Sequence, residues 1–471
     1  MTLDEILTAR PSAGQPRAYN FPKFDRVVLA SGVRVVTVDL PDRPLVSASL
    51  LIRRGAGDEP ADLAGATILT ARAMSEGTER YPGVELIEAG ERLGATLHVD
   101  ASWDSFTASV EVAASRLGAA LELLAELVER PTFPEADVAR LRDERLNDLL
   151  QIKADPRRRV DQAFNATIYT PDSPYGRMAG GDEETVPRLT PDVLRTTHRS
   201  LLDPRQAAVV VGGDLAGLDV PALVEAALGS LGAEHSGGAS AAVTAPRAES
   251  SVASPIVRFY HRPGSVQTEL RLGHVGLPRR TPDFHAVTVM AAILGGLFNS
   301  RLQMNLREEK GYTYGIGAGF DMRRGAGPFS VRTAVQTAAT VASISECLRE
   351  LDRIRETAVT PAELAAARDY LVGVFPLRFE TPGAVVGAIG GLFAQDLPDD
   401  ELDCYRSNVE AVTIEAVQKA ARDHIHPDRL AIVAVGDADA VGSDLAAAGF
   451  GELRMIADEA LSGGGADEET E

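Results

Sequence analysis

An arginine and a tyrosine stand seven residues apart in the glycine-rich segment NSRLQMNLREEKGYTYGIGAG, as Arg307 and Tyr314. A guanidinium and a phenol are both hydrogen-bond donors, and a donor placed beside a developing oxyanion typically stabilises the transition state by about 3 kcal/mol. The same residues are also typical of a helix end, with Gly311 as the C-cap and Arg307 in a solvated ion pair with a neighbouring glutamate. On these residues alone, the helix end is the simpler interpretation.

Bulk composition limits the classes of protein to which the chain can belong. Its 471 residues exceed one ordinary domain, and its formal net charge of -21 argues against binding nucleic acid. Cys347 and Cys404 are too few for a disulfide framework or a thiolate zinc site. No signal peptide or membrane-spanning apolar run is readable. We therefore expect a soluble cytoplasmic protein that binds neither nucleic acid nor membrane.

Two pairs of segments far apart in the chain read alike. LLDPRQAAVVVGGDL from Leu201 and HIHPDRLAIVAVGDA from His424 each place a proline before an apolar run that ends in Gly-Asp. Such a run predicts a buried strand and a turn. The segments from Ser105 and from Pro328 both read strand, helix, proline-marked turn, helix, and the alternation over residues 106–112 predicts a half-buried strand. The shared offset of about 220 to 230 residues predicts two similar α+β halves.

Composition also marks the boundaries of these halves. Residues 232–255 are rich in Gly, Ala and Ser and lack apolar periodicity, which predicts a flexible linker. We therefore place an N-terminal domain at 1–231 and a C-terminal domain at 256–450. Residues 451–471 are predicted to form a tail whose acidic, glycine-rich end is disordered.

Three consecutive arginines follow a helix start. Asp155 before Pro156 is typical of an N-cap and first helical position. The simplest interpretation of Arg157, Arg158 and Arg159 is then a solvated first turn. A role in gripping an acidic partner is an alternative with no other support in the sequence.

Several long stretches resemble the insulinase-type (M16) zinc peptidases, the family of pitrilysin and the insulin-degrading enzyme. They are SGVRVVTVDLPDRPLVSASLLIRRGAGDEP, DSPYGRMAGGDEETVPRLTPDVLRTTHRSLLDPRQAAVVVGGDL and, most specifically, LGGLFNSRLQMNLREEKGYTYGIGAGF. The resemblance covers nearly the whole chain. It implies an α+β fold of two homologous halves, each an antiparallel sheet with packed helices, joined by a linker and arranged as a clam-shell.

Family members that cut peptides carry H-x-x-E-H, whose two histidines hold zinc from one helix face while the glutamate acts as general base. In the matching segment LAGATILTARAMSEGTERY, the histidine positions fall on Ile68 and Arg72, and the glutamate position falls on Ala71. Ile68 and Ala71 have no donor atom, and the Arg72 guanidinium cannot be deprotonated at any relevant pH. The remaining ligand position falls near Asp148, which alone would hold no zinc.

The histidines elsewhere do not restore the motif. His424 and His426 lie just before a predicted strand and are interpreted as two polar residues in a turn, because no acid or cysteine partner is evident. The complete set is His98, His198, His235, His261, His274, His285, His424 and His426. We therefore expect this chain to bind no metal and no cofactor.

The resemblance also gives Arg307 and Tyr314 a role. In the family, an Arg and a Tyr at this spacing come from the half opposite the zinc and hydrogen-bond the substrate backbone near the scissile bond. In the two-chain branch, one subunit carries H-x-x-E-H and the other carries this pair. The hypothesis is a non-catalytic subunit of a heterodimeric zinc endopeptidase, with zinc in the partner subunit and peptides or unfolded polypeptides as substrates.

A second hypothesis belongs to another class of protein. Some family members without a zinc motif serve as structural or peptide-binding subunits, as in the core proteins of a respiratory complex. Arg307 and Tyr314 would then hold peptide backbone or only pack. A third hypothesis, a peptidase active on its own, is disfavoured by the ligand chemistry at Ile68 and Arg72.

Overall fold

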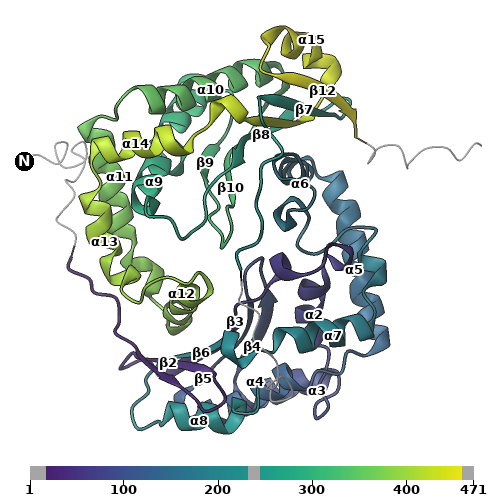
Figure 1. Cartoon of the computed structure of the whole chain (residues 1–471), viewed down its shortest axis with the longest axis vertical. Coiled ribbons are helices and arrows are strands. Elements are labelled where there is room, and N and C mark those ends of the chain that lie inside the picture. Colours follow the sequence, from purple (N-terminus) through teal and green to yellow (C-terminus); the bar gives the residue numbers. More distant parts are fainter. Residues whose placement is uncertain (1–16, 232–243, 459–471) are drawn as a thin grey trace, which may run out of the picture.

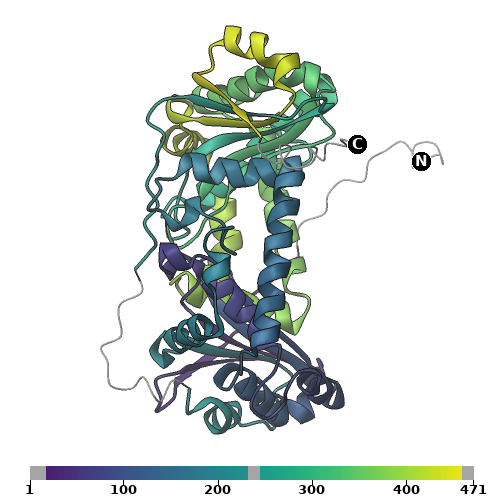
Figure 2. The same cartoon turned by 90° about the vertical axis from the view of Figure 1, so that its right-hand side faces the viewer.

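The computed structural model describes residues 17–231 and 244–458. Two six-stranded sheets stand at opposite ends of the long axis, each with helices packed on it (Figure 1 and Figure 2). The first sheet contains β1 (Asp25–Val28), β2 (Arg34–Asp39), β3 (Leu45–Ile52), β4 (Thr96–Ala101), β5 (Phe106–Ala113) and β6 (Ala207–Gly213). The second contains β7 (Ile256–His261), β8 (Gln267–Val275), β9 (Ile316–Phe320), β10 (Pro328–Gln336), β11 (Ala431–Gly436) and β12 (Glu452–Ala457).

The two sheets share the same arrangement of five strands and differ in the edge strand, because β1 pairs antiparallel with β2 whereas β12 pairs parallel with β7. Their strand orders are β1-β2-β6-β3-β5-β4 and β12-β7-β11-β8-β10-β9. From the second strand onward the pairing is parallel once and then antiparallel three times in both sheets. Each predicted repeat pair occupies equivalent strands, β6 with β11 and β5 with β10. The predicted α+β fold of two similar halves is confirmed.

One detail of the fold prediction is corrected. The sheets are mixed rather than wholly antiparallel, because β6 runs parallel to β2 and β11 runs parallel to β7. Each of these strands returns to the sheet after a long helical excursion, which is the kind of crossover that parallel neighbours require. The repeat segments identified the strands but not the direction in which they pair.

Helices cover both faces of the sheets. Those of the first half are α2 (Ala66–Met74), α3 (Val84–Leu93), α4 (Leu117–Glu129), α5 (Glu135–Ala154), α6 (Pro156–Ile168), α7 (Pro191–Leu201) and α8 (Val220–Leu228). Those of the second half are α9 (Phe284–Ala291), α10 (Thr340–Glu356), α11 (Pro361–Val374), α12 (Pro382–Ala394), α13 (Glu401–Ala411), α14 (Ile414–His424) and α15 (Ala438–Ala448). None of the helices in the described ranges combines the length and the apolar character that crossing a membrane requires.

Strand β5 shows how each sheet buries its outer face. Phe106, Ala108, Val110 and Val112 are buried, whereas the residues between them are partly or fully exposed, which confirms the predicted alternation. The buried set packs with α4 and its neighbours in the core of the first half. In the second half, α9, α10 and α14 enclose the corresponding core.

The inner faces of the sheets are covered by helices exchanged between the halves. Helix α6 belongs to the first half but packs on β8 and β11 of the second sheet, and α12 of the second half packs on β3 and β6 of the first sheet. Val160 and Phe164 of α6 are buried against Val433, and Val386 of α12 is buried in one cluster with Val38. A fully buried side chain of this size contributes about 1.5–3 kcal/mol. The two sheets therefore face each other across α6 and α12 (Figure 2).

A buried carboxylate ties the two halves together near the centre of the molecule. Asp104, in the turn between β4 and β5, is only 4% exposed. Its oxygens accept hydrogen bonds from the Tyr175 hydroxyl at 3.0 Å, the backbone N–H of Arg324 at 2.7 Å and the Gln395 amide at 3.2 Å. The Arg324 guanidinium also donates to Asp58 at 2.7 Å. Segments from both halves thus converge on one side chain.

The prediction of a flexible linker at 232–255 is wrong for its second part, residues 244–255. Residues 232–243 lie outside the described residues, but residues 244–255 pack along the end of α6. The backbone N–H of Thr170 donates to the carbonyl of Glu249 at 3.0 Å, and Val252 is buried. Small residues here permit close packing as well as flexibility, which the composition alone could not distinguish.

The predicted tail at 451–471 begins too early. Glu452–Ala457 forms β12 in parallel with β7, so the second half extends to the end of the described residues. Most side chains of β12 are exposed, since it is an edge strand, and it therefore lacks the apolar pattern that marks the other strands. The predicted disordered end lies outside the described residues.

Replacing the central carboxylate should loosen the junction between the halves. We expect Asp104→Ala to reduce the free energy of unfolding by about 3 kcal/mol. The substitution leaves the backbone N–H of Arg324 and the Tyr175 hydroxyl without the carboxylate that accepts their hydrogen bonds. Urea unfolding followed by circular dichroism measures the change. Asp192→Ala, at a side chain that is 92% exposed, is the control. Equal stability of the two variants would contradict a tying role for Asp104.

Candidate functional site

Helix α2 carries the three residues that stand where the family motif would supply zinc ligands. Ala71 is 1% exposed and packs in the first core, and Ile68 lies partly buried against the same core. Arg72 points outward and donates from Nη2 to Oε2 of Glu144 on α5 at 2.8 Å. A hydrocarbon, a methyl group and a permanent cation offer no lone pair to a dication. The set does not fit a zinc ion.

The acidic residues facing this helix are also occupied. Glu144 and Asp148 lie one turn apart on α5, and Glu144 accepts a second hydrogen bond from Arg140 at 2.7 Å. Asp148 pairs with Arg158 at 2.6 Å and with Arg145. Partial burial alone would raise the pKa of Asp148, but the hydrogen bond from Arg158 and the charge of Arg145 outweigh it and lower the pKa. The structure thus places arginine–carboxylate pairs where a metal would need free carboxylates.

The histidine pair before β11 is tied into the fold. His424 Nε2 lies 2.8 Å from Asp283, an acid partner that the sequence did not reveal. The backbone N–H of His426 donates to His274 Nε2 at 3.1 Å, and the two rings lie 4.9 Å apart. Burial lowers the pKa of His274 to about 4, so it is a neutral acceptor at physiological pH. The two residues point to different partners rather than to one ion.

One other group of potential ligands converges within the described ranges. His261, Asp437 and Asp439 place one ligand atom each within 4.8 Å of one another. His261 Nδ1 accepts the backbone N–H of Ala438, and Asp437 caps the start of α15 and accepts the backbone N–H of Gly264. The group is accounted for by the turn that begins α15.

Arg307 and Tyr314 are brought together in the second half. Arg307 lies in a π-helical segment, Gln303–Glu309, which ends before Gly311 at a φ of +65°. The Arg307 guanidinium carbon lies 5.3 Å from the Tyr314 ring centroid and 4.8 Å from that of Phe298. An arginine within about 6 Å of two aromatic ring centroids is in a favourable cation–π arrangement. The helix end that the sequence suggested is present, including a 3.4 Å contact from Arg307 to Glu308, and it also positions Arg307 beside Tyr314.

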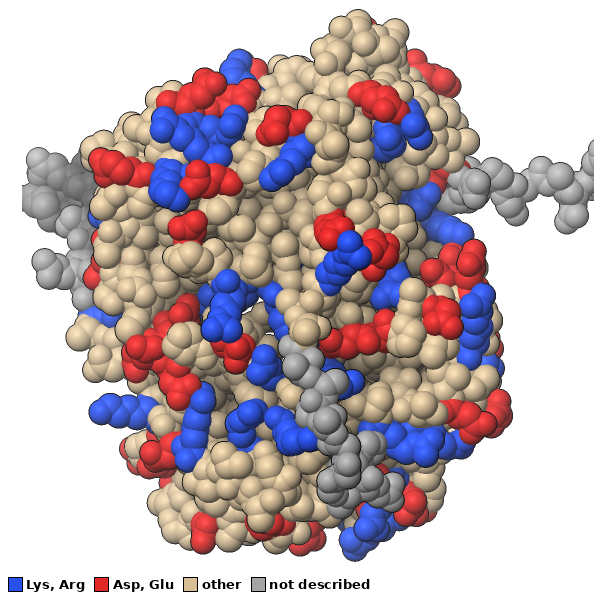
Figure 3. All heavy atoms as spheres, viewed as in Figure 1, with Lys and Arg blue, Asp and Glu red and all other residues tan. Residues whose placement is uncertain are grey.

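Tyr314 is available to a ligand. Its side chain is 90% exposed, and it lies two residues before β9 and lines a pocket bordered by α6. Figure 3 shows a hollow near the centre of the molecule with Lys and Arg side chains gathered around it. The exposed phenol and the partly exposed guanidinium are donors free to meet a polypeptide backbone.

Side-chain hydrogen bonds anchor the segment that carries Arg307. Arg301 donates from Nε to Glu363 at 2.7 Å and from Nη2 to the same carboxylate at 3.2 Å. The Asn305 amide donates to Glu346 and Glu350 of α10 at 2.9 and 3.0 Å. These anchors hold the backbone on which Arg307 stands.

Known proteins resemble the chain along most of its length. Residues 34–177 match the model described as insulinase (peptidase family M16), and residues 188–371 match the model described as peptidase M16 inactive domain. The chain belongs to the insulinase (M16) family. The match to the M16 model described as inactive includes Arg307 and Tyr314, whereas α2 lies within the other match.

Relatives of this M16 chain carry two kinds of name. It is 26% identical to an uncharacterized zinc protease of Streptomyces coelicolor, over 84% of this chain and 86% of the relative. It is 22% identical to a non-peptidase homolog of Helicobacter pylori, over 84% and 89%. Among solved structures, a peptidase M16 inactive domain from Pseudomonas fluorescens superposes with a TM-score of 0.81 at 25% identity, covering 88% of this chain and 98% of that one.

Sequence reasoning missed several residues near Arg307, Tyr314 and α2. Phe298, whose ring centroid lies 4.8 Å from the Arg307 guanidinium carbon, gave no signal in the sequence because a single exposed aromatic residue is not specific to any role. The three arginines of α6 do not form a uniform solvated turn. Arg158 pairs with Asp148, Arg159 pairs with buried Asp458 at 3.1 Å, and Arg157 lines the pocket beside Tyr314.

Metal analysis tests the chemistry of α2. We expect the purified chain, dialysed against buffer containing zinc and then against metal-free buffer, to retain far less than one equivalent of zinc by mass spectrometry. The physical reason is the guanidinium at Arg72 and the absence of donor atoms at Ile68 and Ala71. One tightly held equivalent would refute this account.

Acid should weaken the anchor behind Arg307. The hydrogen bonds from Arg301 and from the backbone of Thr360 outweigh partial burial and lower the pKa of Glu363 to about 2. Its stabilising effect is therefore complete above the unfolded pKa of about 4.3 and is lost as the pH falls towards 2. After allowance for solvent screening, the wild-type chain should lose about 1 kcal/mol more between pH 5 and pH 3 than Glu363→Gln.

Urea unfolding at the two pH values measures this difference. Glu85→Gln, in the exposed first turn of α3, serves as the control and should follow the wild type. An identical loss of stability in Glu363→Gln and in the wild type would show that the anchor does not titrate.

Proposed function

We propose that this chain is the non-catalytic subunit of a two-chain M16 zinc endopeptidase, and that it supplies Arg307 and Tyr314 to peptide bound at the partner's zinc site. The partner would bring the zinc and the general base. The observation that carries the proposal is the contrast between the two halves of this chain. Helix α2 offers arginine–carboxylate pairs instead of ligands, while the Arg307–Tyr314 pair is assembled and open to a ligand.

The residues of this chain suit a role in binding an extended peptide. Stacking between Phe298 and Tyr314 orients the Arg307 guanidinium without consuming all of its five N–H donors. The Tyr314 hydroxyl adds a donor from the start of β9. Two donors held on one rigid segment lose little entropy on binding a carbonyl oxygen, and they stabilise it most strongly when negative charge develops there.

The alternative is a zinc-less structural or peptide-binding homologue, and the name of one relative favours it. The Helicobacter pylori protein is named a non-peptidase homolog. A chain with that role would keep the fold and could keep the Arg307–Tyr314 stack for holding peptide backbone without chemistry. The two proposals therefore differ in whether a zinc-bearing partner exists and whether its turnover depends on this chain.

Purification of the native protein, followed by mass spectrometry of what accompanies it, tests the first point. A stoichiometric partner with H-x-x-E-H and zinc-dependent peptidase activity in the complex are expected. Recovery of the chain alone, or in an assembly without peptidase activity, would favour the structural homologue.

Substitutions in the reconstituted pair test the second point. Arg307→Ala and Tyr314→Phe should each lower kcat/KM by roughly ten- to a thousand-fold, because each removes a donor that acts in the transition state. Arg195→Ala on α7 and Tyr81→Phe in the first half are the matched controls and should retain full turnover. Unchanged kcat/KM in both site variants would contradict a role for the pair in catalysis.

A further inference from the structure

A pocket of about 360 Å³ opens beside Tyr314, on the face of the second sheet that α6 covers. Its walls come from both halves of the chain, with α6 on one side and β8, β10 and the segment before β9 on the other. The charged and phenolic side chains that line it are Arg157, Asp161, Glu269, Arg271, Arg332 and Tyr314. It is thus continuous with the proposed substrate site but is not part of the Arg307 stack.

Three of these side chains are joined by hydrogen bonds between opposite charges. Arg271 is 3% exposed, and its guanidinium donates to Asp161 at 2.6 Å and to Glu269 at 3.2 Å. Both carboxylates in the pocket are therefore engaged by the buried arginine at its base. Burial also raises the pKa of Glu269, against the opposing charge of Arg271.

The other two arginines form no close ion pair, although the charge of Arg157 acts on Glu269 at longer range and opposes the rise in its pKa. Within residues 17–231 and 244–458, no carboxylate lies within 4.0 Å of the Arg157 or Arg332 guanidinium, whereas Arg271 has two. Arg332 Nε donates to Ser330 Oγ at 2.8 Å, which restrains the side chain, and Arg332 lines the pocket. Three arginines against two carboxylates leave one excess positive charge in a chain of net charge -21.

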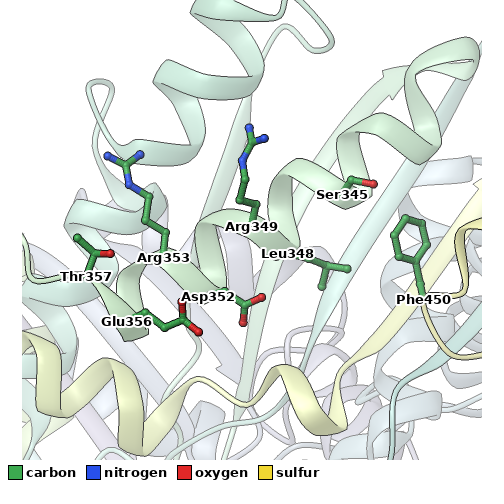
Figure 4. Close-up of a pocket in the computed structure, with 8 residues that line it drawn as sticks. All are labelled: Ser345, Leu348, Arg349, Asp352, Arg353, Glu356, Thr357 and Phe450. Carbon is green, nitrogen blue, oxygen red and sulfur yellow. The ribbon is translucent and has the colours of Figure 1, made fainter.

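The arginines that line a second pocket form ion pairs with nearby glutamates. It has a volume of about 540 Å³ and lies along α10, with Arg349 and Arg353 among its lining residues (Figure 4). Both arginines pair with glutamates of the same helix, Arg349 with Glu346 and Arg353 with Glu350. The pocket beside Tyr314 differs from the pocket along α10, because Arg157 and Arg332 come from separate elements and neither has a carboxylate within 4.0 Å in the part of the chain that the structure describes.

We propose that the pocket beside Tyr314 binds a single carboxylate of a peptide, either an acidic side chain or the C-terminus. Guanidinium groups match the planar fork of a carboxylate, and one negative charge neutralises the excess charge of the pocket. A phosphate carries nearly two negative charges, which exceeds the single excess positive charge of the pocket. The choice of a peptide as the ligand rests on the proposed function, and the site would select substrates with a carboxylate near the residue that contacts Tyr314.

Fluorescence anisotropy of labelled peptides on the purified chain tests this inference without a partner subunit. One neutral peptide is made with a free C-terminus and with an amidated one, and an amidated version is made with a central Glu and with a central Gln. At low salt we expect at least one carboxylate probe to bind about tenfold more tightly than its neutral twin. The arm that shows the preference identifies the source of the carboxylate.

In the double variant Arg157→Gln and Arg332→Gln, the ratio of the affinities of the carboxylate probe and its neutral twin should fall close to one. The melting temperature should not change, because both side chains are exposed. Arg349→Gln, in the pocket along α10, should preserve it. Equal binding of the twins to the wild type, absence of binding by all four probes, or a preference that survives in the double variant would overturn the inference. Displacement by inorganic phosphate far more strongly than by acetate would also overturn it.

These outcomes are separable from failure of the proposed function. Loss of kcat/KM on Arg307→Ala in the reconstituted pair would stand even if the four peptides bound alike. Conversely, a carboxylate preference that depends on Arg157 and Arg332 would stand in a chain that never joins a peptidase.

Discussion

Each sheet of this molecule has two apolar faces, and the helices of its own half cover only the outer one. The inner face must be covered by the other half, which α6 and α12 accomplish by crossing over. Burial of these crossed helices therefore holds the halves in register more firmly than a surface contact could. The hydrogen bonds to Asp104 fix the relative orientation of the two halves, whose contact apolar burial already favours.

The crossing of α6 also decides what surrounds Tyr314. Because α6 packs on the second sheet, residues from the first half meet β8 and β10 there, and Arg157 joins Arg271 and Arg332 in one pocket. The same helix start places Arg158 beside Asp148, where the two side chains form an ion pair at 2.6 Å. One helix thus contacts both the acidic residues that face α2 and the pocket beside Tyr314.

Local patterns predicted much of this structure. The repeated strands, the alternation in β5 and the helix start at Asp155 are properties of neighbouring residues, and all are found. The pairing of Arg307 with Tyr314 followed from a seven-residue spacing and a family resemblance. The exchange of helices did not, because an amphipathic helix shows that it has an apolar face but not which sheet that face meets. The pocket at Arg157 and Arg332 was likewise hidden, since it joins segments 175 residues apart.

The central claim is that catalytic power arises only when this chain completes a partner's site. Titrating this chain into a fixed concentration of the separately purified H-x-x-E-H subunit, with a fluorogenic peptide as substrate, tests it most directly. We expect negligible hydrolysis by either chain alone and activity that rises to a plateau at a 1:1 ratio. Full activity of the zinc-bearing subunit alone, unchanged by addition of this chain, would contradict the account.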